Sequence, residues 1–236
     1  MQPYHSLILS NMKYILSIFV SLLLFACGSS NSTEKVNPTR SLNEVLACGN
    51  LAGLEKKYGK ESLISDTTWV IGDDSLRGTI IYPNSNRQVY VYYRDGQIVD
   101  VTIVGNASEW KTDSGLLLGM PLQSVQAINQ KNFTLSGFNW KHAGSVVSWE
   151  GGKLMGDSTL GHLASFSNAS NQHEGISDAE YQQISGETEF DVRHEVIQKL
   201  NPSLDLISLV RPFIPNKEEG KSMSKRISDS QVPAGK

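Results

Sequence analysis

The sequence predicts an α+β fold built from two tandem units, each a helix followed by an antiparallel sheet, with the helices packed on one face of the sheet. Three observations predict it. Apolar residues recur at helical spacing after Ser41 and again after Pro121. Each helical stretch precedes short runs rich in Val, Ile, Tyr and Thr, a composition typical of strands. Asp95-Gly96 stands between two such runs, as in a tight β-hairpin.

The first 26 residues have the pattern of a signal peptide. Lys13 supplies a positive charge, and the run from Tyr14 to Ala26 is apolar and uncharged. This run is shorter than the roughly 18–20 residues of a membrane-spanning helix, and it matches a signal-peptide hydrophobic region. An uncleaved anchor helix and a buried core helix are the alternatives. Because residues 1–11 form an uncharged and partly polar leader, we hypothesise that Met12 is the true start.

Residues 24–28 read Leu-Phe-Ala-Cys-Gly and resemble the lipobox of bacterial lipoproteins. The resemblance implies that Cys27 becomes the first mature residue and carries acyl chains such as palmitate, which anchor the protein to the lipid bilayer. It also implies a place in the bacterial cell envelope, with the folded domain in the periplasm or at the cell surface. Gly28 stands where Asp would be expected for inner-membrane retention, so the resemblance favours the outer membrane.

Composition excludes several classes of partner. The formal net charge is −3, and cleavage after Ala26 would remove Lys13 and no acidic residue. A basic surface for nucleic acid is therefore not expected, nor is a polybasic membrane signal. Acyl chains would have to provide the attachment. Cys48 would be the only other cysteine, which leaves no disulfide framework and no zinc-binding cysteine pair, so we expect it to pack as a small hydrophobic residue.

The mature chain divides into three predicted regions. Residues 27–40 are mostly Ser, Asn, Thr, Pro and charged residues, which predicts a flexible tether. Residues 213–236 are similarly polar, which predicts a disordered tail. The α+β domain between them is expected at 41–212, with units at about 41–107 and 108–170 and C-terminal elements at 176–212.

The first unit opens on a helix. Ser41 and Glu44 have capping-box spacing, and Gly59 follows the last apolar position of the helical pattern at Tyr58. Two glycines inside this stretch weaken its middle, so two short helices are an alternative to one. Three antiparallel strands are predicted within residues 67–104.

The second unit repeats the order of helix and then sheet. Pro121 precedes a helix with apolar positions at Leu122, Val125 and Ile128. Strands are predicted at 138–140, 145–149, 162–166 and 204–210. Ser177 and Glu180 form a second predicted capping box, and a last short helix is expected at about 194–200.

Two resemblances support this organisation. Gly119-Met120-Pro121-Leu122, followed by Val125 and Ile128, resembles the helix entry of the SmpA/OmlA (BamE-like) lipoproteins of the outer-membrane barrel-assembly machine. Those proteins share a helix-plus-sheet unit with the β-lactamase-inhibitor-protein fold, which carries it in tandem. Residues 115–120, 137–140 and 149–154 resemble a set of uncharacterised bacterial lipoproteins. That resemblance covers roughly 108–155 and implies a lipid-tethered helix-and-sheet domain without a catalytic assignment.

Aromatic residues are the candidate binding residues. Strand alternation places Tyr90 and Tyr92 on one face of their strand, opposite Val89 and Val91. With Trp140 and Trp149 they could form an aromatic sheet surface that binds a peptide, a glycan or another subunit. The alternative is that Trp140 and Trp149 fill the core between helix and sheet.

No catalytic, metal-binding or cofactor-binding residue is assigned. The chain has no Gly-x-Ser-x-Gly, His-Glu-x-x-His or Cys-x-x-Cys motif and no calcium loop, and its histidines lack a paired spacing. We therefore predict a non-enzymatic envelope lipoprotein that acts as an adaptor or assembly module through a protein partner. The alternative is an envelope hydrolase of glycan or peptide, which a Ser–His pair within hydrogen-bond distance would favour.

Overall fold

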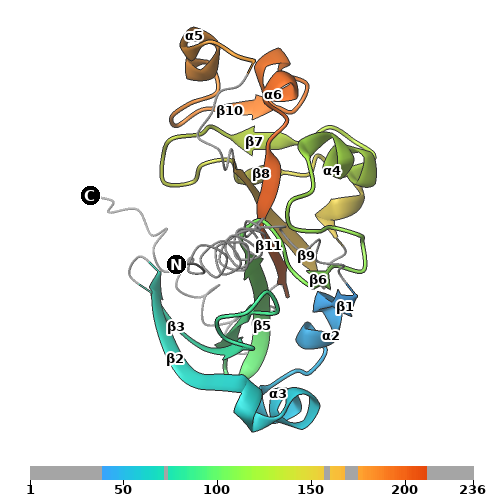
Figure 1. Cartoon of the computed structure of the whole chain (residues 1–236), viewed down its shortest axis with the longest axis vertical. Helices are drawn as coiled ribbons and strands as arrows, with labels where there is room; N and C mark the ends of the chain where they lie inside the picture. The colour runs from blue at the N-terminus through green and yellow to red at the C-terminus, as the bar shows by residue number, and fades with distance from the viewer. Residues whose placement is uncertain (1–38, 72–73, 157–159, 168–174, 212–236) are drawn as a thin grey trace, which may run out of the picture. The chain divides into compact units, whose positions relative to one another are not determined.

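Helices and antiparallel sheets make up the part of the chain that the computed structural model describes, residues 39–71, 74–156, 160–167 and 175–211, which confirms the α+β fold class (Figure 1). The largest sheet has six strands in the order β2 (Leu63–Ile71), β3 (Asp74–Ile81), β4 (Val89–Arg94), β5 (Gln97–Val104), β11 (Ser203–Val210) and β9 (Gly161–Ser167). A three-stranded sheet has the order β10 (Glu189–Asp191), β7 (Thr134–Ser136) and β8 (Val146–Ser148). Two short strands, β1 (Arg40–Ser41) and β6 (Trp110–Lys111), pair in parallel.

The helices are short, and they separate the strands along the chain. The α-helices are α2 (Leu42–Leu46), α3 (Leu51–Tyr58), α4 (Leu122–Asn129), α5 (Asp178–Gln182) and α6 (Glu195–Leu200), with 3-10 turns η1 (Lys60–Ser62) and η2 (Lys153–Met155). Two short helices, not one, therefore follow residue 41. Gly49 lies between them at φ 77°. Gly59 directly follows α3, and its amide donates to the Glu55 carbonyl, which confirms its predicted cap position.

The hairpin predicted at Asp95-Gly96 joins β4 and β5. Both residues have positive φ, 51° and 74°, and Arg94 pairs directly with Gln97. Two consecutive positive φ angles define a type I′ turn, whose twist matches that of the flanking strands. The same region holds four strands where three were predicted, because β2 begins at Leu63 and pairs with β3. Polar residues interrupt the alternation of β2, so only the pairing with β3 defines it.

One face of the six-stranded sheet packs on the core. Val91, Val101 and Leu209 lie side by side on β4, β5 and β11, and all three are fully buried. Helix α2 lies against β5 and β11 and contributes the buried side chains of Leu42 and Val45. Burial of these apolar groups is the main favourable term in the stability of the domain.

The capping box predicted at Ser41 and Glu44 is wrong, whereas the one at Ser177 and Glu180 is confirmed. Ser41 lies in β1, and its hydroxyl donates to Asp113 Oδ1 at 2.6 Å instead of capping α2. The Glu44 carboxylate forms an ion pair with Lys57, with Oε2 and Nζ 2.7 Å apart. The Ser41 hydroxyl, which the local pattern assigned to the helix cap, therefore bonds a residue that the tertiary fold brings close.

The strand predicted at residues 138–140 is a turn, and the strand lies earlier, at Thr134–Ser136. Phe138 makes only an isolated bridge with Ser185, and the Trp140 indole donates to the Gly137 carbonyl at 2.8 Å, which folds the segment back on itself. The strands predicted near 145–149, 162–166 and 204–210 are confirmed as β8, β9 and β11.

The tandem-repeat arrangement and the domain boundaries stay predictions. Strand β11 inserts between β5 and β9, so both halves of the chain share one sheet, while β7 and β8 belong to the smaller one. The signal peptide, Cys27, most of the tether and the tail after Pro212 lie outside the described residues. Among the helices that are described, none is long and apolar enough to span a bilayer.

Candidate functional site

Trp149 is a core residue, and its predicted place in a binding surface is wrong. Its side chain is 7% exposed, and its ring packs on Phe133 at a centroid distance of 5.1 Å. The indole Nε1 donates to the His162 carbonyl at 2.7 Å. The alternative interpretation, that this tryptophan fills the core, is the correct one.

Trp140 is partly exposed but lies apart from β4, in the turn after β7. Its Nε1 donates to Ser136 Oγ at 2.9 Å as well as to the Gly137 carbonyl. The ring makes an edge contact with His142 at 5.2 Å. These bonds hold the turn, so the four predicted aromatic residues do not form one surface.

Tyr90 and Tyr92 lie on the face of β4 that points away from the core, as strand alternation predicts. Both tyrosines are half-buried. The alternate residues of the strand, Val89 and Val91, are fully buried. Burial raises the pKa of Tyr92, and the nearby Asp100 carboxylate adds to the effect.

The Tyr90 face, as we name it, is the side of the six-stranded sheet opposite the core. Ladder pairing aligns one residue from every strand in a row across it: Ile64, Ile80, Tyr90, Thr102, Ser208 and Leu163. Both ends of the row are exposed apolar side chains, Ile64 at 45% and Leu163 at 50% exposure, and Val104, two residues after Thr102 on β5, is 48% exposed. Thr102 and Ser208 at the centre of the row are buried, so the accessible part of this face is apolar and lies toward its ends.

Asp100 occupies the middle of the Tyr90 face, where it links two strands. Its Oδ1 accepts hydrogen bonds from Thr102 Oγ1 at 2.7 Å and from Ser208 Oγ on β11 at 2.6 Å. Burial raises the pKa of this carboxyl, and the two hydroxyl bonds oppose the rise. We interpret Asp100 as a structural residue that joins β5 to β11 through hydrogen bonds, rather than as a catalytic acid.

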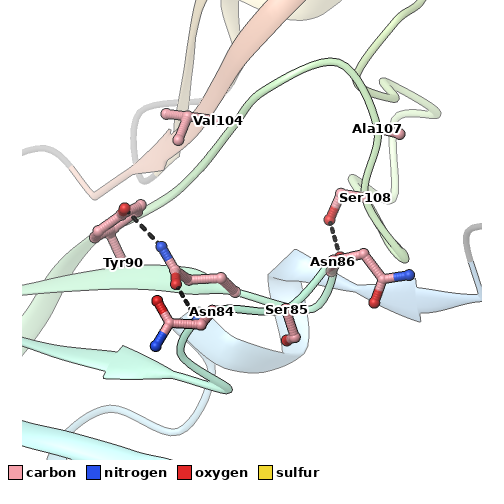
Figure 2. Close-up of a pocket in the computed structure, with 8 residues that line it drawn as sticks. Asn84, Ser85, Asn86, Tyr90, Val104, Ala107 and Ser108 are labelled. Carbon is pink, nitrogen blue, oxygen red and sulfur yellow. Dashed lines mark hydrogen bonds between the residues drawn. The ribbon is translucent and has the colours of Figure 1, made fainter.

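A hollow of about 280 Å³ borders Tyr90 at the edge of this face (Figure 2). It is lined by Asn84, Ser85, Asn86, Gln88, Tyr90, Val104, Ala107 and Ser108. We call it the amide pocket. Its side chains come from the turn between β3 and β4, from the start of β4, and from the segment that follows β5.

Hydrogen bonds hold the walls of the amide pocket. Gln88 Nε2 donates to the Tyr90 hydroxyl at 2.6 Å, and Gln88 Oε1 accepts from the Asn84 amide at 2.6 Å (Figure 2). Ser108 Oγ donates to the Asn86 carbonyl at 3.2 Å and so fastens the far wall. Asn84 has a positive φ of 58°, a conformation that asparagine tolerates better than most residues.

The chemistry of the amide pocket suits a neutral, hydrogen-bonding ligand. Its lining offers amides, hydroxyls, one aromatic ring and one aliphatic side chain, with no carboxylate, lysine, arginine or histidine. Such groups can pair with the N–H and C=O groups of a polypeptide backbone or with sugar hydroxyls. They supply no nucleophile with an adjacent base, so this pocket has the character of a binding site.

One Ser–His pair does exist, away from the Tyr90 face. Ser114 Oγ lies 3.0 Å from His162 Nε2 and 2.7 Å from Thr112 Oγ1. His162 is 8% exposed, and burial lowers its pKa, with a smaller opposing effect from the Leu154 carbonyl. Its other ring nitrogen, Nδ1, is buried and has no hydrogen-bond partner in the described chain. A neutral imidazole beside a hydroxyl is thus present, but no described residue supplies the carboxylate that orients the base in a hydrolytic triad.

Among the described residues, no group of three or more His, Cys, Asp or Glu side chains could hold a metal ion. The sequence interpretation missed Gln88 and Ser114. Gln88 could have been found, because it precedes Tyr90 by two positions and therefore shares its face of the chain. The pairing of Ser114 with His162 has no sequence signal, since 48 residues separate them.

Comparisons of this chain with protein-family models, with curated proteins and with solved structures give no match. Its function has to be inferred from its own residues.

Proposed function

We propose that the protein is a bacterial envelope lipoprotein, anchored through acylated Cys27, whose folded domain binds a protein partner through the Tyr90 face. The lipobox-like residues 24–28 support the anchor and the compartment. The acyl chains would hold the domain beside the bilayer, and the polar segment after Cys27 would let it reach a neighbouring protein.

The observation that carries the binding role is the composition of the Tyr90 face and its amide pocket. Exposed Ile64, Val104 and Leu163 provide apolar area that becomes buried in a complex. Tyr90 and Val104 both line the pocket, and tyrosine is among the residues that contribute most to binding at protein interfaces. The uncharged pocket favours an extended, neutral segment of polypeptide, whose backbone groups the amides of Asn84, Asn86 and Gln88 can bond.

The test uses two valines with matched exposure on different surfaces. Val104 on the Tyr90 face is 48% exposed, and Val147 on β8 is 49% exposed. A photo-crosslinking amino acid at position 104 in intact cells is expected to yield one dominant adduct with an envelope protein, absent when the probe is at position 147. Tyr90→Ser should lower the yield of that adduct by about tenfold, since interface tyrosines are frequent hot spots.

Two results would contradict the proposal. Identical adducts from positions 104 and 147, or none from 104, would show that this face does not bind a protein. Mass spectrometry of the N-terminal peptide checks the anchor separately: an unmodified Cys27 thiol would remove the lipoprotein part and leave the binding part standing.

The second candidate is an envelope hydrolase that acts on glycan or peptide. The 3.0 Å contact between Ser114 and His162 favours it, because a serine needs a neutral base within this distance to become a nucleophile. Against it, His162 lacks an orienting carboxylate among the described residues, and neither residue lines the amide pocket.

A further inference from the structure

The structure has a second hollow, of about 210 Å³, whose lining residues differ from those of the amide pocket. Its walls combine aromatic and polar side chains: Phe138, Phe166, Tyr181, Asn139, Ser167 and Asp205. None of them lines the amide pocket, so the two hollows are separate sites. Unlike the first, this one contains a carboxylate.

Asp205 is placed there by a β-bulge. Leu204 pairs with Phe166 and Leu206 with Ser165, so Asp205 is an extra residue on β11 that has no partner on β9. Its own carbonyl accepts from the Gly105 amide at 2.8 Å, which holds the bulge against the end of β5. Bulges commonly redirect a side chain beside a functional site, and this one directs a carboxylate into the wall of a hollow.

One oxygen of the Asp205 carboxylate lacks a partner: Oδ1 is buried and has no hydrogen bond in the described chain. No ion pair joins it to a lysine or arginine among those residues. Burial raises its pKa, as expected for a carboxyl group with little compensation. Buried acceptors are nearly always paired, so an unpaired one calls for a partner such as a water molecule, an ion or a ligand group.

The other walls are held by the fold. The Phe138 amide donates to the Ile184 carbonyl at 2.8 Å, and its carbonyl accepts from Gly186 at 2.7 Å. The Phe138 and Tyr181 rings lie 6.4 Å apart, and the Tyr181 hydroxyl reaches Asn139 Oδ1 at 3.5 Å. Asn139 has a positive φ of 60°, a conformation that asparagine adopts more readily than most residues. The hollow is thus formed before any ligand arrives.

We propose that this hollow binds an organic cation, a primary ammonium or guanidinium group, with the Asp205 carboxylate as its hydrogen-bond acceptor and counter-charge. Aromatic rings beside a carboxylate form the usual environment of a bound alkylammonium, because ring faces attract cations and their carbon surface accepts the alkyl chain. An anion would be repelled by Asp205, and a single carboxylate is too few ligands for a calcium or magnesium ion. The volume fits one basic side chain or a small amine.

This inference does not depend on the proposed protein-binding face, because no residue is shared. The cation could belong to a free amine or to a basic side chain of a polypeptide. The chemistry at Asp205 is the same in both cases, and the probes below distinguish the two sources.

Isothermal titration calorimetry on the full mature protein in detergent tests the proposal. The probes are n-butylammonium, the neutral n-pentanol of similar size, and Nα-acetyl-lysine methylamide. The wild-type protein is expected to bind the ammonium about tenfold or more tightly than the alcohol, since a charge-assisted hydrogen bond is lost with the alcohol. Tighter binding of the lysine derivative than of butylammonium would assign the cation to a polypeptide, and weaker binding would assign it to a free amine.

Asp205→Asn keeps the shape of the side chain and removes its charge, and should weaken ammonium binding by about tenfold or more without affecting the alcohol. Asp95→Asn is the control, because it removes the same charge at the exposed turn between β4 and β5, where asparagine tolerates the positive φ of 51°. It should leave binding unchanged. Equal affinity of the wild type for ammonium and alcohol, which requires no variant, would overturn the proposal, as would an unchanged affinity in a folded Asp205→Asn protein.

Discussion

Single buried polar side chains link distant parts of this domain. Asn129 at the end of α4 is fully buried. Its Nδ2 donates to the carbonyls of Lys131 and Trp149, and its Oδ1 accepts from the Leu154 amide. Each bond satisfies a backbone group that would otherwise be buried without a partner. A side-chain amide, with two donors and an acceptor, can do this where a hydroxyl could not.

Ser114 also satisfies a buried polar group, the His162 imidazole. Experiments on Ser114 distinguish the two candidate functions. Ser114→Ala removes the only described partner of His162 Nε2, so we expect it to lower the free energy of unfolding by about 1–3 kcal/mol, the cost of an unsatisfied buried group. Because no carboxylate in the described part of the chain orients His162, we also expect that a fluorophosphonate probe does not label the wild-type protein. Urea unfolding and mass spectrometry of the labelled protein measure the two quantities.

Ser65→Ala, at an exposed position of β2, is the stability control and should change the unfolding free energy by less than about 0.5 kcal/mol. Covalent labelling of Ser114 itself would contradict the binding role and favour the hydrolase.

Among the secondary-structure elements, α5 shows how a short helix can depend on its first residues. Five residues are too few for an isolated helix to be stable in water. Ser177 Oγ accepts from the Glu180 amide at 3.3 Å, and the Glu180 carboxylate accepts from the Ser177 amide at 2.8 Å. Lys199 on α6 adds an ion pair to Glu180 at 2.9 Å. The cap and the ion pair together hold the turn between Gly175 and β10.

The capping box makes stability depend on pH in the acidic range. Backbone and side-chain hydrogen bonds from Ser177, and one from Lys199, lower the pKa of Glu180 from 4.5 to about 2. A lowered pKa in the folded state contributes stability above pH 4.5, and that contribution is lost as the pH falls toward about 2. Glu180→Gln should therefore lower Tm at neutral pH and flatten the dependence of Tm on pH across this window, measured by circular dichroism.

Glu195→Gln is the matched control, because Glu195 also pairs with Lys199 at 2.9 Å but takes no part in the cap. A Glu195 variant that flattens the pH dependence as much as the Glu180 variant would mean that the ion pair, and not the cap, causes it.

At the scale of the whole molecule, β11 joins the two halves of the chain. It pairs with β5 and β9, whose residues lie far earlier in the sequence, and Ser208 on β11 bonds Asp100 across 108 residues. Ile207 is fully buried at its centre, directly between Ile103 and Ala164. With this strand in place, neither half has a complete sheet of its own.

Ile207→Ala should lower the free energy of unfolding by about 2–5 kcal/mol, because it leaves a cavity where the two halves meet. Unfolding should remain a single transition, coincident by tryptophan fluorescence and circular dichroism, since both halves share the sheet. Leu163→Ala on the adjacent strand, where the side chain is 50% exposed, should cost less than about 1 kcal/mol. Two separate transitions in the wild-type protein would show instead that the halves unfold independently.

Features that depend on neighbouring residues could be predicted from the sequence. The Asp95-Gly96 hairpin, the cap at Ser177 and the two faces of β4 around Tyr90 follow from backbone preferences and the two-residue period of a strand, which operate over a few positions. The lipobox-like residues ending at Cys27 are also a local pattern, and they remain the basis of the proposed envelope location.

Tertiary structure decided what distant segments do when they meet. It placed β11 between β5 and β9, buried Trp149, took the Ser41 hydroxyl from its helix, and brought Ser114 to His162 and Asp205 to a hollow. Each of these outcomes depends on which apolar faces pack together across the whole chain. The energy of that packing exceeds the local preference of any single residue, so no short stretch of sequence contains the answer.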